Sequence, residues 1–261
     1  MIAKSMTPAS VLKVDVNEET LPAAVAGLKT CGIRGFNLTM PNKNKIVELL
    51  DELSPEAQLI GAVNTVLNDN GKLIGYNTDG YGFMQSVRDA GHDITGKNIT
   101  VMGVGGASMA ICAQSALDGA ASVHIFARRT SRYWNRTQKF AENLSAKTGC
   151  QVCLFDNDDH TALRDSIAQS YLLINATSVG MVPDIDDTII KDTSLFHPEL
   201  VVADVVYEPQ ETRLLREAKA AGCQTFNGMY MLLHQGAKAF QIWTGQEMPV
   251  SVIKEKYFSV K

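Results

Sequence analysis

Short apolar runs alternate with longer amphipathic segments along most of this 261-residue chain. Runs of a few consecutive apolar residues are typical of buried strands, whereas apolar positions three and four residues apart are typical of helices. Regular alternation of the two is the pattern of βαβ units. The sequence therefore predicts an α/β protein.

The first third of the chain contains the less regular units. Apolar runs predict strands over residues 11–16, 35–40, 62–67 and 72–76, and helical spacing appears over residues 21–29, 45–53 and 82–90. The segment Asn68-Asp-Asn-Gly71 joins the last two strands. Asn-Gly pairs favour the tight turns of β-hairpins, so these two strands are expected to pair.

From residue 98 onward the alternation is more regular. Nearly continuous apolar runs predict parallel strands over residues 99–102, 122–126, 151–155, 171–176, 201–206 and 224–226. Such runs are expected where helices cover both faces of a sheet. Helices are predicted over residues 108–117, 135–147, 162–169, 212–221, 229–243 and 250–257.

A turn-rich segment, residues 91–97, predicts the boundary between two α/β domains. Residues 98–228 are expected to form a Rossmann-type domain with a doubly wound parallel sheet. Residues 1–97, joined by the helical residues 229–261, are expected to form the other domain.

The composition excludes several classes of protein. Hydrophobic residues make up 45% of the chain and charged residues 20%, as in ordinary globular proteins. The net charge of −4 gives no indication of a nucleic-acid partner, and no apolar run approaches the roughly 20 residues that span a bilayer. The first residues contain no signal-peptide core. These features favour a cytoplasmic protein.

The five cysteines do not predict a disulfide framework, because their number is odd and they are widely spread. Cys150 and Cys153 form a C-x-x-C, but they lie in a strand-like run without a second cysteine pair. Two strand cysteines are therefore the preferred interpretation. The five histidines are scattered, and no metal site is expected.

The loop Gly103-Val-Gly-Gly-Ala-Ser108 follows a predicted strand and opens a predicted helix. In that setting glycines permit a tight turn and the close approach of a pyrophosphate, and the helix N-terminus offers free N–H groups. An ordinary strand–helix turn is the alternative, because Ser108 stands where Gly or Ala is usual. The candidate cofactor-binding residues are Gly103, Gly105, Gly106, Ala107 and Ser108.

The end of the following strand should decide which dinucleotide binds. It reads Phe126-Ala-Arg-Arg-Thr-Ser-Arg132, with three arginines and no acidic residue. A carboxylate there would hold the ribose 2′-hydroxyl of NAD, whereas arginines suit the 2′-phosphate of NADP. Arg128 and Arg129 therefore favour NADP, with NAD as the alternative. A solvated basic turn is the other interpretation, above all for Arg132.

Two motifs in the first third carry the candidate chemistry. One places Lys43 just after a strand-like run, and the other places Asp79 just before a helix-like run, with Asn64 in a strand between them. A lysine, a carboxylate and an amide at neighbouring strand ends suit a small polyhydroxylated substrate that gains or loses a proton. A surface ion pair is the simpler alternative.

These segments belong to a set of motifs whose order resembles the shikimate dehydrogenase family, and most closely its quinate/shikimate dehydrogenase branch. The resemblance covers nearly everything from residue 35 to the C-terminus. The motifs are Asn37-Leu-Thr-Met-Pro-Asn-Lys43, Gly61-Ala-Val-Asn-Thr65, Gly75-Tyr-Asn-Thr-Asp79, Gly103-Val-Gly-Gly-Ala107, Asn175-Ala-Thr-Ser-Val-Gly-Met181, Asp204-Val-Val-Tyr-Glu-Pro209 and Met231-Leu-Leu-His-Gln-Gly236.

The resemblance implies an NAD(P)-dependent enzyme that reversibly oxidises shikimate, or quinate, to the 3-dehydro acid in aromatic amino acid biosynthesis. It assigns the catalytic pair to Lys43, which relays a proton at the reacting oxygen, and Asp79, which orients it. A free lysine, with a pKa of about 10.4, is a poor base at neutral pH. Burial or a cationic neighbour would have to lower that value, or the lysine serves as an acid or charged donor.

The resemblance also implies further site residues, each of which would otherwise be interpreted as capping or surface polarity. The first domain becomes the substrate domain. The implied substrate-binding residues are Thr39, Asn64, Tyr207 and Gln235, and the residues implied near the nicotinamide are Thr177, Met181, Gly228 and Met229.

The N-terminus departs from the family pattern. Family members open with a strand, a Ser-x-Ser-Pro loop that grips the substrate carboxylate, a helix and a second strand. Ser5-Met-Thr-Pro8 resembles the loop, which makes Ser5 and Thr7 candidate substrate-binding residues, and residues 11–16 resemble the second strand. No room remains for the helix. Either the chain has lost a βα segment, or the natural protein has residues that this sequence omits.

Three hypotheses about function follow. The first is a shikimate or quinate dehydrogenase that works as a monomer or a homodimer. The second is a regulatory or relic module that binds a dinucleotide without turnover because part of its substrate pocket is missing. The third is a dehydrogenase for another cyclic polyol acid. Intact Lys43 and Asp79 favour an enzyme, whereas the choice between shikimate and quinate stays open.

Overall fold

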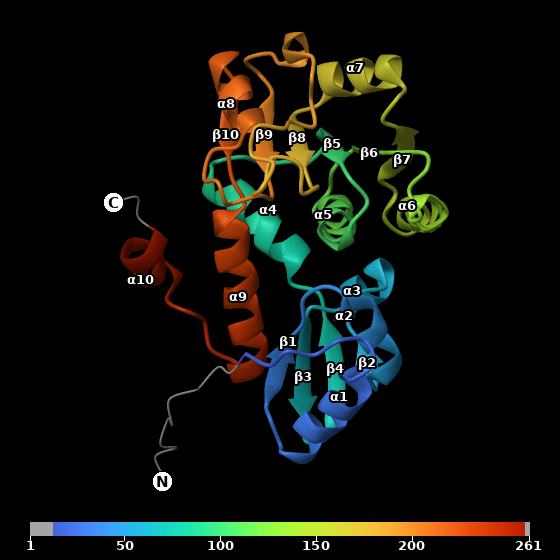
Figure 1. Cartoon of the computed structure of the whole chain (residues 1–261), viewed down its shortest axis with the longest axis vertical. Coiled ribbons are helices and arrows are strands. Elements are labelled where there is room, and N and C mark those ends of the chain that lie inside the picture. Colours follow the sequence, from blue (N-terminus) through green and yellow to red (C-terminus); the bar gives the residue numbers. More distant parts are fainter. Residues whose placement is uncertain (1–12, 259–261) are drawn as a thin grey trace.

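The structure, a computed structural model, describes residues 13–258 and contains two sheets stacked along the long axis of the molecule (Figure 1). A four-stranded mixed sheet lies at one end and a six-stranded parallel sheet at the other. Two helices, α4 (Asp79–Asp89) and α9 (Met229–Thr244), lie between the sheets and pack against each other. The expected α/β class is confirmed.

The six-stranded sheet has the order β10-β9-β8-β5-β6-β7, and every neighbouring pair is parallel. Counted from its first strand this is 3-2-1-4-5-6, the doubly wound order of the Rossmann fold. All six predicted strands are present. Their bounds are β5 Asn98–Met102, β6 Ser122–Ala127, β7 Gln151–Asp156, β8 Leu172–Asn175, β9 Val201–Asp204 and β10 Gln224–Phe226.

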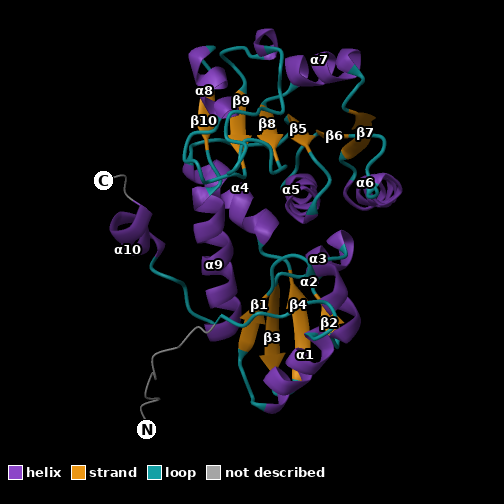
Figure 2. Ribbon diagram, in the orientation of Figure 1, coloured by secondary structure: helices purple, strands orange, loops and turns teal. Residues whose placement is uncertain are grey.

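Helices cover both faces of this sheet (Figure 2). One face packs against α4, α5 (Gly106–Leu117) and α6 (Trp134–Thr148), and the other against α7 (His160–Gln169) and α8 (Arg213–Ala220). The central strands β5 and β8 are therefore buried on both sides, which explains their nearly unbroken apolar sequences.

The four-stranded sheet has the order β1-β3-β4-β2 and is built around a hairpin. Strands β3 (Thr65–Asp69) and β4 (Lys72–Tyr76) pair antiparallel through Asn70 and Gly71, whose φ angles are 53° and 93°. Two successive positive φ angles define the hairpin turn that the Asn-Gly pair predicted. Strand β1 (Gly35–Asn37) pairs antiparallel with β3, and β2 (Glu52–Leu53) pairs parallel with β4.

The strand predicted over residues 11–16 is wrong for its described part. Residues 13–16 form no strand. The Val16 carbonyl accepts a hydrogen bond from the Asn42 side chain at 2.7 Å, and the Val16 side chain packs against the apolar cluster of the four-stranded sheet, whereas Val14 is 65% exposed. Alternation yields a strand only where another strand pairs with it. Helix α1 (Leu21–Thr30) follows as predicted.

The helix predicted over residues 45–53 is also wrong in most of its length. Helix α2 (Asn42–Lys45) ends where that prediction begins, a 3₁₀ turn η1 (Ile46–Leu49) follows, and the chain then enters β2. The Asp51 N–H donates to the Leu73 carbonyl at 2.9 Å, and the Leu73 N–H donates to the Asp51 carboxylate at 2.7 Å. Pairing with β4 therefore outweighs the helical periodicity.

Sequence reasoning also missed helix α3 (Pro55–Ile60), although its ends carry clear signals. The Ser54 hydroxyl accepts a hydrogen bond from the Ala57 N–H at 3.2 Å, Pro55 stands at the first helical position, and Gly61 ends the helix with a φ of 67°. These are the usual start and stop residues of a short helix.

Close helix–helix packing joins the two sheets. A Cβ atom on Gly82 of α4 would lie 2.7 Å from the Gln235 N and the Met231 carbonyl oxygen of α9, so only glycine permits this approach. Further along the same helices, the buried His234 side chain lies 2.9 Å from Asp89. The C-terminal helices α10 (Val250–Ile253) and η3 (Lys254–Phe258), the latter a π-helix, follow α9.

Candidate active site

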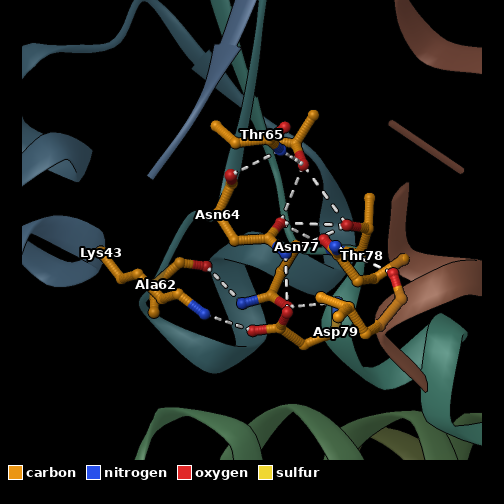
Figure 3. A network of polar contacts seen from close by, with 10 residues as sticks. Lys43, Ala62, Asn64, Thr65, Asn77, Thr78 and Asp79 are labelled. Carbon is orange, nitrogen blue, oxygen red and sulfur yellow. Dashed lines mark hydrogen bonds and ion pairs between the residues drawn. The ribbon is translucent and has the colours of Figure 1, made fainter. Parts of the chain in front are cut away.

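A lysine–carboxylate contact lies where the four-stranded sheet meets α4 (Figure 3). Lys43 Nζ of α2 donates to Asp79 Oδ2 at 2.6 Å. The lysine side chain is 19% exposed and the aspartate side chain 9% exposed. A surface ion pair would be far more exposed, so solvent reaches this pair only through a restricted opening.

Asn64 connects the pair to the sheet. Its side-chain NH₂ donates to Asp79 Oδ1 at 2.8 Å and lies 3.0 Å from the Thr78 hydroxyl, while its Oδ1 accepts from the Thr78 N–H at 2.9 Å. Both carboxylate oxygens of Asp79 therefore have a donor. Asn64 is only 2% exposed, and a buried amide with its partners in place is held in one orientation (Figure 3).

Further residues stabilise Asn64 and Asp79 through hydrogen bonds. The Thr65 hydroxyl donates to Asn64 Oδ1 at 3.0 Å and accepts from the Asn37 amide at 2.9 Å. Asn77 donates to the Ala62 carbonyl at 3.1 Å and accepts from the Asp79 N–H at 3.1 Å. The network thus ties the end of β1, the start of β3 and the end of β4 to the first residue of α4.

The local sequence explains why Asp79 stands at this point. Asp79 is the first residue of α4, where the unpaired N–H groups create a partial positive charge that favours a carboxylate. Lys43 lies on the single turn of α2, directly after β1 and Pro41. Because β1 and β4 both border β3, the two side chains meet at one end of the sheet.

The glycine loop lies between β5 and α5. Gly103 has a φ of 111°, and a Cβ there would lie 2.8 Å from Thr177 Cγ2, so this position requires glycine. No atom lies within 4 Å of a Cβ built at Gly105 or Gly106, and no side chain caps the N-terminus of α5. The loop therefore presents open space in front of a helix N-terminus, as a dinucleotide pyrophosphate requires. Ser108 is buried and donates to the Gly103 carbonyl at 2.5 Å, which supports the loop from inside.

The predicted arginines stand at the carboxyl end of β6, beside this loop. Arg128, Arg129 and Arg132 are all exposed. The Arg129 guanidinium lies 4.8 Å from the centre of the Trp134 ring, and the Arg132 guanidinium lies 4.7 Å from that of Tyr133.

A second buried network, missed in the sequence, lies at the ends of β8 and β9. Asp204 is fully buried and accepts hydrogen bonds from the Val206 N–H, the Thr212 hydroxyl and the Asn175 amide at 2.8 to 3.0 Å. Burial raises the pKa of Asp204 to about 6, although these hydrogen bonds oppose the rise. Asn175 Oδ1 in turn accepts from the Thr177 N–H and hydroxyl. Thr177, which packs against Gly103, is thereby fixed through Asn175.

The other candidate substrate-binding residues of the described chain have no hydrogen bond to the Lys43–Asp79 pair. Thr39 is exposed after β1, and its carbonyl accepts from the Asn42 N–H. The Gln235 amide donates to the Leu232 carbonyl within α9 at 3.1 Å. Within residues 13–258, neither residue has a hydrogen bond to Lys43 or Asp79, and the same holds for Tyr207.

The remaining candidates lie near the second sheet. Tyr207 and Met181 are 43% and 45% exposed. Gly228 precedes α9, and a Cβ there would lie 2.1 Å from the Val205 carbonyl oxygen, which explains the glycine. Met229 begins α9. Ser5 and Thr7 lie outside the described residues.

Sequence reasoning missed Asn37, Thr65, Asn77 and Thr78 as parts of the network. A signal for them exists, because the dipeptide Asn-Thr occurs both at the start of β3 and directly after β4. Paired polar dipeptides at facing strand ends predict a shared hydrogen-bond network once the pairing of the strands is known.

Three further features of residues 13–258 concern a cavity, metal ligands and membrane spans. A cavity of 330 Å³ lies between α3, α4, α5 and α9, but neither Lys43 nor Asp79 lines it. No group of three His, Cys, Asp or Glu residues within this range gathers as metal ligands would. Nor does any helix in it combine the length and the apolar character needed to cross a membrane.

The doubly wound sheet and its glycine loop define a Rossmann-type protein. The lysine–carboxylate pair lies near the helix that this loop opens, because a Cβ on Gly80, next to Asp79, would lie 2.3 Å from the Ala110 carbonyl oxygen of α5. Comparison with known families is more specific. Residues 1–66 match the shikimate dehydrogenase substrate-binding domain, and residues 228–256 match the shikimate 5′-dehydrogenase C-terminal domain. Together with a relative that is 50% identical over 95% of this chain and 84% of its own length, these matches show that the chain belongs to the shikimate dehydrogenase family.

Similar proteins include the shikimate dehydrogenase (NADP⁺) of Listeria innocua, which is 50% identical over 95% of this chain and 84% of its own length. The quinate/shikimate dehydrogenase of Escherichia coli is 41% identical over 97% of this chain and 88% of its own. The crystal structure of shikimate 5-dehydrogenase from Listeria monocytogenes with shikimate and NAD has a TM-score of 0.90 and 49% identity, and it covers 93% of this chain and 83% of that one.

Proposed function

We propose that this protein catalyses the NADP-dependent, reversible oxidation of shikimate to 3-dehydroshikimate, a step of aromatic amino acid biosynthesis. The observation that carries the proposal is the 2.6 Å contact between Lys43 Nζ and Asp79 Oδ2 beside a dinucleotide-type loop. Relatives at 50% and 41% identity that are named for this activity support it. Quinate is the second candidate substrate, because one of those relatives is named for both acids. Nothing in the fold or the comparisons favours a catalytically impaired module.

Lys43 exchanges a proton with the oxygen on the substrate carbon that is oxidised, and as an ammonium it donates this proton when the reaction runs towards shikimate. Asp79 holds the ammonium group through Oδ2, and Asn64 holds Asp79 through Oδ1, so the lysine is aimed before the substrate binds. Pre-alignment of this kind removes the need to reorient the charged groups during the reaction. NADP⁺, when bound, would accept the hydride that leaves the oxidised substrate carbon.

The residues around the glycine loop fit a dinucleotide. Gly105, Gly106 and Ala107 would face the pyrophosphate at the start of α5, while Gly103 and Ser108 shape the loop. Arg128 and Arg129 would hold the 2′-phosphate. Thr177 and Met181, which follow β8 next to the loop, would border the nicotinamide together with Gly228 and Met229, which follow β10.

The substrate hydroxyls and carboxylate would be bound from the other side of the site. Hydroxyl and amide groups both donate and accept hydrogen bonds, which suits a polyol acid. The proposed residues are Thr39, Asn64, Tyr207 and Gln235, together with Ser5 and Thr7. In this division residues 1–97 and 229–261 form the substrate domain, and residues 98–228 form the dinucleotide domain.

We further propose that the enzyme acts in the cytoplasm as a monomer or a homodimer. The five cysteines are all free thiols, as expected in a reducing compartment. Size-exclusion chromatography with light scattering determines the number of subunits.

The activity is tested by following the absorbance of the reduced cofactor with shikimate or quinate and with NADP⁺ or NAD⁺. Turnover with shikimate and NADP⁺ is expected. Absence of turnover with both acids and both cofactors would refute the proposed function. If the protein turns over only another cyclic polyol acid, that acid is the substrate instead of shikimate, and the proposed reaction class still holds.

A further inference from the structure

The turn that joins β6 to α6 holds three arginines in a fixed frame. The Ser131 N–H donates to the Arg128 carbonyl at 2.9 Å, and the Trp134 N–H donates to the Ser131 carbonyl at 3.0 Å, so two tight turns follow each other. The Gly103 N–H donates to the Phe126 carbonyl at 2.8 Å. The arginine turn is therefore tied to the strand that opens the glycine loop.

Two of the arginines are seated on aromatic rings of the same turn. The Arg129 guanidinium lies 4.8 Å from the ring centre of Trp134, which is only 9% exposed and begins α6. The Arg132 guanidinium lies 4.7 Å from the ring centre of Tyr133 and donates to its hydroxyl at 2.6 Å. A guanidinium that lies over a ring keeps N–H groups available for a phosphate.

One carboxylate, that of Asp156, is hydrogen-bonded to the backbone of this turn. Asp156 ends β7 rather than β6, and its Oδ1 accepts from the Arg129 N–H at 3.3 Å and from the Asp158 N–H at 3.2 Å. No acidic residue occurs between Phe126 and Trp134. The turn thus favours a phosphate over a ribose hydroxyl.

We propose that Trp134 and Tyr133 determine cofactor specificity by holding Arg129 and Arg132 where the 2′-phosphate of NADP binds. They act as positioning residues, since their rings contact the arginines that would bind the phosphate. Three arginines within five residues repel one another, and each long side chain loses rotamer freedom when it binds. Ring contacts reduce both costs before the cofactor arrives.

This inference rests on the proposed use of NADP, but its test does not depend on turnover. Calorimetry compares adenosine 2′,5′-bisphosphate, which carries the distinguishing phosphate, with 5′-AMP, which lacks it. The proteins are the wild type and the variants Trp134→Leu, Trp134→Phe and Tyr133→Leu. Trp134→Phe is the matched control, because it retains a ring beneath Arg129.

Affinity for the bisphosphate should fall ~5-fold in Trp134→Leu and by a smaller factor in Tyr133→Leu, since a cation–π contact of this kind is modest at an exposed site. Trp134→Phe should keep most of the affinity, and the affinity for 5′-AMP should stay near that of the wild type in all variants. The ratio of kcat/KM with NADP to kcat/KM with NAD should fall in parallel.

Equal losses for both nucleotides would show that Trp134 merely supports the fold, and unchanged bisphosphate affinity in both leucine variants would also overturn the proposal. If Trp134→Leu does not fold, the bisphosphate affinity of Tyr133→Leu decides the test, because Tyr133 is only half-buried. A wild type that binds the bisphosphate more tightly than 5′-AMP but does not oxidise shikimate would contradict the proposed function and leave the specificity inference standing.

Discussion

The candidate site has two halves, and they differ in which atoms form them. The substrate half contains the Lys43–Asp79 pair, and the cofactor half contains the glycine loop. The Lys43–Asp79 half consists of side chains that hydrogen-bond to one another, with Asn64 and Thr65 almost fully buried behind them. The glycine-loop half consists mainly of backbone, with open space at Gly105 and Gly106 where side chains would stand.

The difference determines what each half tolerates. A side-chain network depends on the chemical identity of each member, because removing one leaves a buried partner without its hydrogen bond. A backbone loop depends on the absence of atoms, so any side chain that fills the space interferes. Asp204 and Asn175 are an exception, since they bring a side-chain network into the cofactor half.

The largest effect is expected in the half that contains Lys43 and Asp79. Lys43→Ala should lower kcat ~1000-fold, the middle of the range for loss of a positioned acid or base, because no other group then moves the proton. Steady-state kinetics with saturating shikimate and NADP measure the effect. NADP affinity should be unchanged.

Lys45→Ala is the matched control, because Lys45 is an exposed lysine on the same helical turn. It should stay within about 2-fold of the wild type, as surface substitutions usually do. Retained activity in Lys43→Ala would remove the lysine from the mechanism.

The next effect concerns the buried acid of the cofactor half. The pKa of Asp204 rises from 3.8 to about 6 on burial, so the folded protein binds more protons than the unfolded chain between these two values. Stability from this group is therefore highest at low pH and falls by about 3 kcal/mol as pH rises from about 4 to about 6.

Asp204→Asn removes this dependence. Denaturant titrations at pH 4 and pH 7 should show the free energy of unfolding of the wild type, relative to the variant, about 3 kcal/mol lower at the higher pH. If the free energies of unfolding of the two proteins change with pH in the same way, ionisation of Asp204 does not destabilise the folded protein.

Within the loop, two glycines should respond differently. Gly105→Val should weaken NADP binding by about 2 kcal/mol, or ~30-fold in Kd, by filling the open space, with little change in melting temperature. Gly103→Val should instead lower the melting temperature, because its φ of 111° and its 2.8 Å approach to Thr177 exclude a side chain.

Calorimetry with NADP and thermal unfolding of both variants separate these effects. If Gly103→Val has the melting temperature of the wild type, position 103 does not require glycine. If Gly105→Val binds NADP with normal affinity, the open space at position 105 is not needed for the cofactor.

The smallest effect is expected at Thr65, which supports the Lys43–Asp79 pair through Asn64. Thr65→Val has nearly the same shape but loses the hydrogen bond to Asn64, which should cost about 1 kcal/mol of stability. KM for shikimate should rise a few-fold while the Kd for NADP stays constant. A change in NADP affinity instead would show that the two halves are coupled through the sheet.

Much of the cofactor half could be predicted because its signals are local. The loop follows one strand and opens one helix within a few residues, and Arg129 stands about 20 residues further along, at the end of the next strand. Each feature depends on backbone torsion and on sequence-adjacent elements. The ring contacts of Arg129 and Arg132 were not foreseen, because they depend on rotamers within the turn.

The substrate half could be predicted only in part. Lys43 and Asp79 were identified from their motifs, yet their 2.6 Å contact depends on β1 and β4 both bordering β3. Residues 45–53 have helical periodicity, but pairing with β4 turns their end into strand β2. Residues 13–16 have strand-like alternation, but no described strand pairs with them.

The sequence by itself determined the α/β class, the parallel sheet, the glycine loop and the residue types of the proposed catalytic pair. These follow from apolar periodicity and from residues with restricted torsion angles, which act over a few positions. Only the tertiary structure decided which polar groups share a hydrogen-bond network, and which short segments become strands. Those outcomes depend on contacts between residues far apart in the chain, where burial and strand pairing outweigh local preference.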